Sequence, residues 1–332
     1  MFIISLLVSL FTFVELNCEN LFDCHHDSLK NDVEFLPEGS YHWTRFRYWR
    51  KLNRVGQTIV ACGENSFNDA LSVNDSAAYS QWIMPDMVAL CEVENDSVMH
   101  DLTRRSLLRG ARYEYVMTSS PDGRGIDVAL MYSPFTFRLL GSRSVRVQPI
   151  KGMRPTRDVL YVNGIVMGGD TLHVVVAHFP SRRGGEAHSR PFRHAAAEVV
   201  CTVLDSIKQV QPHANIIVAG DFNDYSTSES LQMICSHDMT DVSRQATGSH
   251  GAKGTYRYQG QWGSLDHILV SKPLYDRLHH CFIADYPFLL VPDHKYGGVQ
   301  PKRNYMGPRW VDGFSDHLPL VMRLNLNPKN QP

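Results

Sequence analysis

Polar side chains that can bind a metal ion or move a proton stand at the ends of six short apolar runs in this sequence. Asp221 and Asn223 follow the run in NIIVAGDFND, and Asp316 and His317 come directly before the run in SDHLPLV. Over all six runs, the residues are Asn17, Glu92, His178, Asp221, Asn223, Asp266, Asp316 and His317. One such residue alone is typical of a turn, because Asp, Asn and Gly favour turns for backbone reasons. The whole set instead indicates a site, since functional side chains in α/β proteins gather where strands end.

The runs that would position these residues have the length and the β-branched composition of strands. They cover residues 11–18, 86–93, 113–119, 127–133, 159–167, 171–179, 215–220, 265–270 and 318–326. Residues 159–179 predict a hairpin that turns at Asn163–Gly164, because Asn-Gly is a strong hairpin signal.

Two segments, 47–63 and 191–210, have the apolar periodicity of helices that lie on a sheet. The second starts near Pro191, an early helical position, and its apolar face comprises Ala196, Val199, Val200, Val203, Leu204 and Ile207. Many strands with few long helices favour an α/β fold of packed mixed sheets with helices outside.

The composition is that of an ordinary globular protein and excludes several classes. Of 332 residues, 43% are hydrophobic, and 33 basic residues against 34 acidic ones give a net charge of −1. No global field therefore draws the protein to nucleic acid or to an anionic membrane. The 7 cysteines are scattered without a CxxC pair, which argues against a zinc site or a disulfide framework.

The N-terminal residues 1–12 are strongly apolar and allow two interpretations. They resemble the core of a signal peptide, but they lack a basic leading segment and a small-residue cleavage site, and the run is too short to span a bilayer. The following FTFVELN alternates like a strand, so the segment is either a signal or a strand extension, and both an exported and a cytoplasmic location stay open. No Pro/Gly-rich linker follows, so residues 13–325 are expected to form a single domain.

The six motifs LNCENLFD, LCEVEN, AHFPSRRGG, GDFND, LDHILVS and SDHLPL occur in the order found in the endonuclease/exonuclease/phosphatase superfamily. Over residues 13–325 the chain resembles members such as deoxyribonuclease I and exonuclease III, and above all a bacterial subgroup that opens with NxENLFD. This resemblance implies a four-layer α/β/β/α sandwich, with the site at one edge of two packed sheets.

The resemblance also implies a metal site. Asn17 and Glu92 match the ligands that hold a divalent cation in this family, and Asp316 adds a carboxylate nearby. Hard oxygen ligands of this kind suit Mg²⁺ or Mn²⁺ rather than zinc.

The remaining residues match positions that act on the phosphoester. His317 corresponds to the histidine that orients or deprotonates the attacking water, and Asp266 to the carboxylate that fixes its tautomer. Asp221 and Asn223 correspond to the pair that positions the nucleophile and a phosphoryl oxygen. His178 matches a second histidine that protonates the leaving oxygen or holds the phosphate. The set thus supplies what hydrolysis of a phosphodiester requires.

Several arginines are candidate phosphate contacts, because a guanidinium fork matches phosphate oxygens. They are Arg124, Arg182, Arg183, Arg190 and Arg303, and for Arg182, Arg183 and Arg190 a solvated loop position is in each case an equally good explanation. The loop 293–313 leads directly into SDH, which predicts a substrate-facing rim. The stretch 41–54 mixes basic and aromatic residues, which suits either base stacking or, preferably, the sheet-facing side of a helix.

These residues predict a divalent-metal-dependent phosphoesterase that hydrolyses phosphodiester bonds with activated water. A nuclease acting on DNA is the first interpretation. The alternative is a phosphatase or phosphodiesterase acting on an inositol phosphate, a sphingomyelin-like lipid or another small phosphorylated substrate. A non-catalytic binding module is a remote third, because such a module would have lost its ligands. No obligate protein partner is evident, and the oligomeric state stays open.

Overall fold

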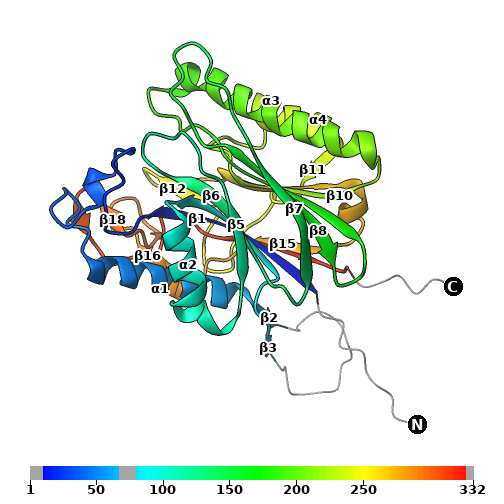
Figure 1. Ribbon diagram of the computed structural model, residues 1–332. Coiled ribbons are helices and arrows are strands. Elements are labelled where there is room, and N and C mark those ends of the chain that lie inside the picture. Colours follow the sequence, from blue (N-terminus) through cyan, green and yellow to red (C-terminus); the bar gives the residue numbers. More distant parts are fainter. Residues whose placement is uncertain (1–9, 67–79, 327–332) are drawn as a thin grey trace, which may run out of the picture.

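The computed structural model of the chain describes residues 10–66 and 80–326 (Figure 1). Residues 1–9, most of the segment interpreted as a signal or a strand extension, lie outside the described residues. Phe11 and Thr12 of that segment begin strand β1 (Phe11–Leu21). Within the described ranges, no helix is both long enough and apolar enough to cross a membrane.

Two six-stranded mixed sheets form the centre of the fold. The first sheet has the order β15-β20-β1-β4-β6-β5, and the second has the order β11-β14-β10-β9-β8-β7. The first consists of β15 (Leu278–Ile283), β20 (Leu320–Leu324), β1, β4 (Met87–Val93), β6 (Asp127–Tyr132) and β5 (Glu114–Met117). The second consists of β11 (Met239–Asp241), β14 (Asp266–Ser271), β10 (Asn215–Asp221), β9 (Thr171–His178), β8 (Val159–Val166) and β7 (Phe137–Val145).

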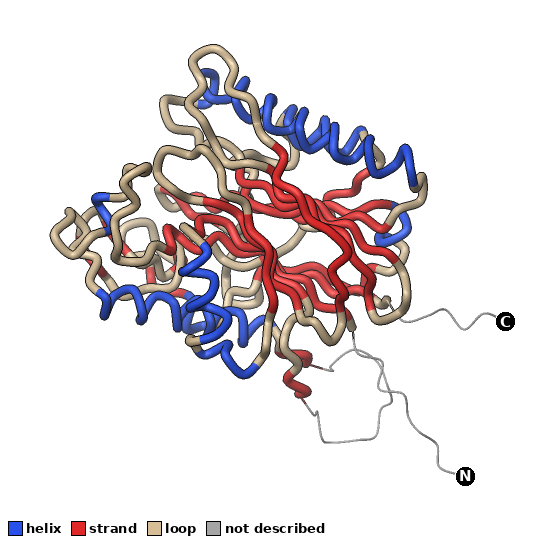
Figure 2. Tube along the Cα trace, in the orientation of Figure 1, coloured by secondary structure: helices blue, strands red, loops and turns tan. Residues whose placement is uncertain are grey.

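Helices cover the outer face of each sheet, so the chain forms the predicted four-layer α/β/β/α sandwich (Figure 2). Helices α1 (Arg45–Cys62) and α2 (Asp96–Arg104) pack on the first sheet, and α3 (Glu186–Val210) packs on the second with α4 (Glu229–Ser236) beside it. The smaller elements are the short helix α5 (Lys272–Tyr275) and the hairpins β2–β3 (Glu64–Ser66, Ser80–Trp82), β12–β13 (Tyr256–Tyr258, Gln261–Gly263), β16–β17 (Leu290–Pro292, Val299–Pro301) and β18–β19 (Tyr305–Met306, Arg309–Trp310).

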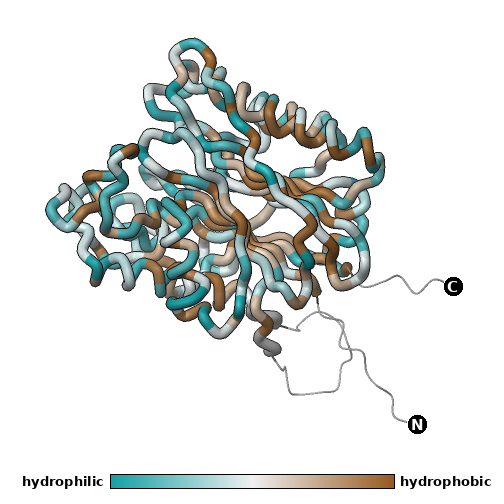
Figure 3. The backbone as a smooth tube through the Cα atoms, viewed as in Figure 1, coloured by the Kyte–Doolittle hydropathy of each residue, from teal (hydrophilic) through white to brown (hydrophobic). Residues whose placement is uncertain are grey.

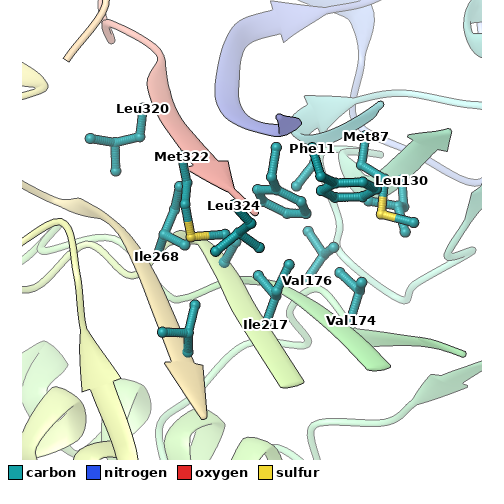
Figure 4. Close-up of a cluster of buried hydrophobic side chains, with 14 of the residues drawn as sticks. Phe11, Met87, Leu130, Val174, Val176, Ile217, Ile268, Leu320, Met322 and Leu324 are labelled. Atoms are coloured by element: carbon teal, nitrogen blue, oxygen red, sulfur yellow. The ribbon is translucent and has the colours of Figure 1, made fainter. Parts of the chain in front are cut away.

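The apolar core has three layers, because each central strand is buried on both faces. On β1, Phe11 and Phe13 point into the space between the sheets, whereas Val14 and Leu16 point toward α1 and α2. This follows from the alternation of side chains along a strand. Figure 4 shows the inter-sheet layer, where side chains of β1, β4, β6 and β20 meet those of β9, β10 and β14. Hydrophobic residues accordingly follow the sheets, and hydrophilic ones gather in the loops (Figure 3).

All nine predicted strands and both predicted helices are present. The predicted apolar face of α3 is buried apart from Val199, which is partly buried and packs against the same cluster. Helix α3 starts at Glu186, so Pro191 lies in its second turn instead of near its start, and that part of the prediction is wrong. On α1, Leu52, Val55 and Ile59 are buried against the first sheet, which confirms the preferred interpretation of the stretch 41–54.

The hairpin β8–β9 is present, but its predicted turn is wrong. Strand β8 runs straight through Asn163 and Gly164, and the chain turns at residues 167–170, where Gly169 has a φ of 88°. A Cβ on Gly164 would lie 2.2 Å from the ring of Phe137. The glycine therefore serves close packing of β7 on β8 rather than a turn.

Candidate active site

Strand register brings the predicted residues to one edge of the two sheets, named here the site edge. In the first sheet, β1 and β4 run parallel, and Asn17 pairs with Cys91 beside Glu92. In the second sheet, Asp221 pairs with His178 on one side and with Asp266 on the other. The segment 315–317 precedes β20, which runs antiparallel to β1 and pairs its first residue, Leu320, with Glu15. His317 therefore returns to the level of Asn17.

His317 and Asp266 form a buried pair at this edge. Nδ1 of His317 lies 2.7 Å from Oδ2 of Asp266, and the hydroxyl of Thr255 donates to the same oxygen. Ser315 fixes the chain just before: its hydroxyl donates to the carbonyl of Asn17 (2.7 Å) and accepts from the amide of His317 (3.1 Å). Because Nδ1 is engaged, Nε2 is the ring atom of His317 that remains for other partners.

Burial disfavours the charged form of His317, but the charge and the hydrogen bond of Asp266 outweigh it. With a further contribution from Asp221, they raise the pKa of His317 well above its usual value. A neighbouring carboxylate thus favours the protonated form of this histidine.

Asp221 lies at the centre of the group. Its Oδ2 accepts a hydrogen bond from Nδ2 of Asn17 (3.0 Å) and lies 3.5 Å from Nε2 of His178 and 4.0 Å from Nε2 of His317. Its Oδ1 accepts from the backbone amide of Asn223 (2.8 Å). Burial, followed by the charge of Asp266, raises the pKa of Asp221 to about 7. Asp221 is thus a carboxylate able to exchange a proton near neutral pH.

Glu92 reaches the site from a β-bulge. The register of β4 with β6 shifts between Cys91 and Val93, and Glu92 at this shift has a φ of 61°. A positive φ is unfavourable for a residue with a Cβ and is often retained where function requires it. One carboxylate oxygen of Glu92 accepts from the amide of Asn20 (2.8 Å), and the other lies 3.9 Å from Nε2 of His178.

The pKa of His178 is shifted in the opposite direction to that of His317. Burial, and after it the positive charges of Arg157 and Arg124, lower the pKa of His178 well below its usual value. Its Nδ1 is buried without a hydrogen-bond partner among the described residues. The pKa values of the two imidazoles are therefore shifted in opposite directions, and environments that shift two titratable groups apart in this way are typical of catalytic sites.

The donor set fits a divalent cation. Buried carboxylates crowd the site edge, and the pKa of Asp221 is raised partly because Asp266 repels its charge, a repulsion that a cation relieves. Single ligand atoms of Asp221, Asp266 and His317 lie within 4.8 Å of one another. Asp316 is bound by Arg303, whose Nη2 donates to its Oδ2 (2.8 Å). The assignment of Asn17 and Glu92 as ligands stays a prediction.

Arg157 is a structural member of the site that sequence reasoning missed. It is buried and donates from Nε to the carbonyl of His178 (3.1 Å) and from Nη2 to the carbonyl of Phe179. Its Nη1 pairs with Asp122 at 3.2 Å. Nothing in the local sequence TRDVLYV marks this arginine, because its partners come from distant segments.

Glu19 fastens the loop 293–313 to the site edge. Its carboxylate accepts from the backbone amide of Asn304 (2.6 Å) and lies 3.9 Å from the buried ammonium of Lys51, which donates to the carbonyl of Phe314. Figure 1 shows this loop, with β18, beside the blue segment that follows β1. The role of the loop as a substrate-facing rim stays a prediction.

The five candidate arginines differ in their contacts. Arg182 is engaged by the chain itself: Nε donates to the carbonyl of Asn223 (2.9 Å), Nη2 donates to Asp224 (3.1 Å), and the guanidinium lies over the ring of Tyr225. Arg190 is half-exposed on α3, 3.7 Å from Glu186. Arg303 holds Asp316, whereas Arg124 and Arg183 line a pocket beside the site. Their phosphate contacts remain predictions.

The sequence matches the endonuclease/exonuclease/phosphatase family over residues 12–326. The chain belongs to this family. Its members hydrolyse phosphoester bonds, so the chain is a hydrolase of that class. Whether the chain falls in the NxENLFD subgroup stays a prediction. No curated protein matches the sequence.

Solved structures share the fold at low sequence identity. A family member from Bacteroides thetaiotaomicron is 15% identical with a TM-score of 0.60, and the match covers 95% of this chain and 98% of that one. A mannosyl-6-phosphatase from the same organism is 14% identical with a TM-score of 0.59, over 94% and 98% of the two chains. Truncated TDP2 from Caenorhabditis elegans is 15% identical with a TM-score of 0.54, over 95% and 97%.

Proposed function

We propose that the chain is a divalent-metal-dependent phosphoesterase that hydrolyses its substrate by direct attack of water. The observation that supports this most is the hydrogen-bonded pair of His317 and Asp266 beside the buried carboxylate of Asp221. Asn17 and Glu92 come to the same edge from the other sheet. Groups suited to activating a water, binding a phosphate and holding a cation thus lie together.

Each residue has a role in this proposal. Asp221 accepts a proton from the attacking water, because its carboxylate lies at the centre of the site, 3.5 Å from Nε2 of His178 and 4.0 Å from Nε2 of His317. Asp266 holds Nδ1 of His317, so the protonated ring presents Nε2 to the phosphoryl oxygens. Asn223 positions the phosphate, and His178 contacts the leaving oxygen. When bound to Asn17 and Glu92 with Asp316 nearby, Mg²⁺ or Mn²⁺ supplies charge neutralisation at the phosphate.

DNA is the first candidate substrate, which would make the enzyme a nuclease. We propose no obligate protein partner. The second candidate is a small phosphorylated molecule, as in the mannosyl-6-phosphatase relative. A pocket of about 840 Å³ beside the site favours it, because this volume is typical of small-molecule sites.

A substrate panel tests the proposal. Supercoiled plasmid, abasic duplex, bis-p-nitrophenyl phosphate, inositol phosphates and sphingomyelin are each incubated with Mg²⁺ or Mn²⁺, and again with EDTA. We expect hydrolysis of at least one class with metal and none after chelation. His317→Ala should lower turnover by orders of magnitude in a folded protein, while His213→Ala, an exposed histidine before β10, serves as the control. Activity that survives chelation contradicts the metal requirement, and wild-type rates in His317→Ala contradict the assigned roles.

A further inference from the structure

The pocket beside the site is built by four loops of the chain. It has a volume of about 840 Å³, and its walls come from residues within 20–41, 121–124, 152–157 and 180–192. These loops follow β1, precede β6, precede β8 and follow β9, so each is attached to a strand of one of the two central sheets. The pocket is therefore supported by the same scaffold as the catalytic residues.

Two residues that line the pocket also contact residues of the site edge. Asn20 lines the pocket, and its amide donates to Glu92 (2.8 Å). Arg157 also lines the pocket, and its Nε donates to the carbonyl of His178 (3.1 Å). The pocket therefore lies directly beside the site edge.

Two arginine side chains without a partner line the pocket. Arg154 and Arg183 are exposed pocket residues, and among the described residues neither has a hydrogen bond or an ion pair through its side chain. By contrast, Arg157 is paired with Asp122, and the neighbouring Arg182 is tied to Asp224. Two unpaired guanidinium groups in a concave site favour a phosphate, whose oxygens match the guanidinium fork.

Aromatic rings form another part of the wall. Phe35 and Tyr41 line the pocket with ring centroids 5.1 Å apart, and Phe35 stacks on the buried Phe22 at 4.1 Å. The hydroxyl of Tyr305 donates to the carbonyl of Tyr41 (2.9 Å), which fixes this segment. A half-exposed ring held in place is a stacking platform for a base.

We infer that this pocket binds a nucleotide unit of the substrate, with its second phosphate on Arg154 and Arg183 and its base against Tyr41 and Phe35. The inference rests on the proposed function, because it assigns the non-reacting part of the phosphoester. It makes the substrate a nucleotide-containing phosphodiester, either a nucleic-acid strand or a small dinucleotide. Both sources present the same chemistry: a base and a second phosphate one sugar away from the scissile group.

The first experiment measures binding without catalysis. Adenosine 3′,5′-bisphosphate, adenosine 5′-monophosphate and inositol 1,4-bisphosphate are titrated calorimetrically into the full chain in EDTA. We expect the adenosine bisphosphate to bind at least tenfold more tightly than either other ligand. Arg154→Ala and Arg183→Ala should each weaken its binding about tenfold, Arg→Lys at either position should restore part of it, and Tyr41→Leu should remove the preference over the inositol bisphosphate. The matched control is Arg138→Ala, an exposed arginine on β7.

The second experiment measures cleavage. With Mn²⁺, KM for a 5′-phosphorylated dinucleotide should rise at least tenfold more in Arg154→Ala than KM for bis-p-nitrophenyl phosphate, which has one phosphate. The rates of cleavage of a 5′-phosphorylated single strand and of the dinucleotide, measured at equal concentration, show which of the two is the substrate. Equal effects of Arg154→Ala on both substrates, or equal affinity for both bisphosphates in the titration, overturn the pocket assignment alone. No hydrolysis of any substrate overturns the proposed function, while the titration still decides the pocket.

Discussion

Nδ1 of His317 lies 2.7 Å from Oδ2 of Asp266, and this bond joins two segments of the chain that enter the site from different sheets. Asp266 begins β14 of the second sheet, and His317 precedes β20 of the first. The pair therefore also reports whether the two sheets are correctly aligned at the site edge. Its loss should affect the chemistry more than the fold, because the inter-sheet core lies beneath it.

Asp266→Asn tests this pair directly. The amide keeps the shape but removes the charge that raises the pKa of His317. We expect turnover to fall by about 10²- to 10⁴-fold, the range typical of general acid–base residues. The pKa of His317, followed by NMR of the imidazole, should move down from its raised value. Circular dichroism serves as the folding control, and an unchanged His317 titration would speak against the assigned coupling.

Asp221→Asn should change the pH dependence of stability in the metal-free protein. The folded pKa of Asp221, about 7, is raised above the ordinary aspartate value because the carboxyl is buried beside Asp266. The contribution of this carboxyl group to the free energy of unfolding is therefore fully present below about pH 4 and is lost as the pH rises through about 7. In EDTA, the variant should melt at a higher temperature than the wild type at pH 8 and lose this advantage near pH 4. A constant difference between the two proteins across this range would contradict the raised pKa.

Gly220→Ala should disrupt the site from the backbone side. Gly220 has a φ of 145°, and a Cβ there would lie 1.8 Å from the carbonyl oxygen of Ala177 on the neighbouring strand. Since Asp221 and His178 follow directly on these two strands, we expect destabilisation by about 3 kcal/mol or more together with loss of activity. Gly110→Ala, where a Cβ meets nothing within 4 Å, is the matched control in urea denaturation. Equal midpoints for the two variants would be the contrary result.

The fold and the site differ in how far the sequence alone could predict them. Strands such as β4 and β10 were predictable because they are buried on both faces and read as continuous apolar runs. Strand β7 was missed because it is an edge strand with mostly exposed or half-buried side chains. Helix α4 was missed because only 8 residues carry its periodicity.

The site shows the same division. His317 and Asp221 stand in motifs with their own signal, whereas the contacts of Arg157 and Thr255 arise only when distant segments meet. The local sequence does not reveal such contacts, since each depends on how a loop residue lies against the end of a strand 11 or 21 residues further along the chain. The pairing of Arg182 with Asp224 is a further case, because two loops must fold before this arginine is turned away from the pocket.

Metal titration should identify which residues hold the cation. Two donor sets are available at the site edge: Asn17 with Glu92, and the cluster of Asp221, Asp266 and His317. The first set leaves the hydrogen bond between His317 and Asp266 intact, whereas the second requires the ring to give up that bond or to bind through Nε2. Because only the second set involves His317, variants of Glu92 and of His317 distinguish the two sets, and we expect the proposed first set to hold the ion.

Glu92→Gln should therefore raise the Mn²⁺ concentration that half-saturates the increase in melting temperature by at least tenfold, because the amide removes one ligand charge. His317→Ala should leave that concentration within about threefold of the wild type, since removing a cation from the site does not weaken binding of another cation. Thermal unfolding over a range of Mn²⁺ concentrations measures both variants without any substrate. The opposite pattern, a loss in His317→Ala and none in Glu92→Gln, assigns the ion to the cluster of Asp221, Asp266 and His317.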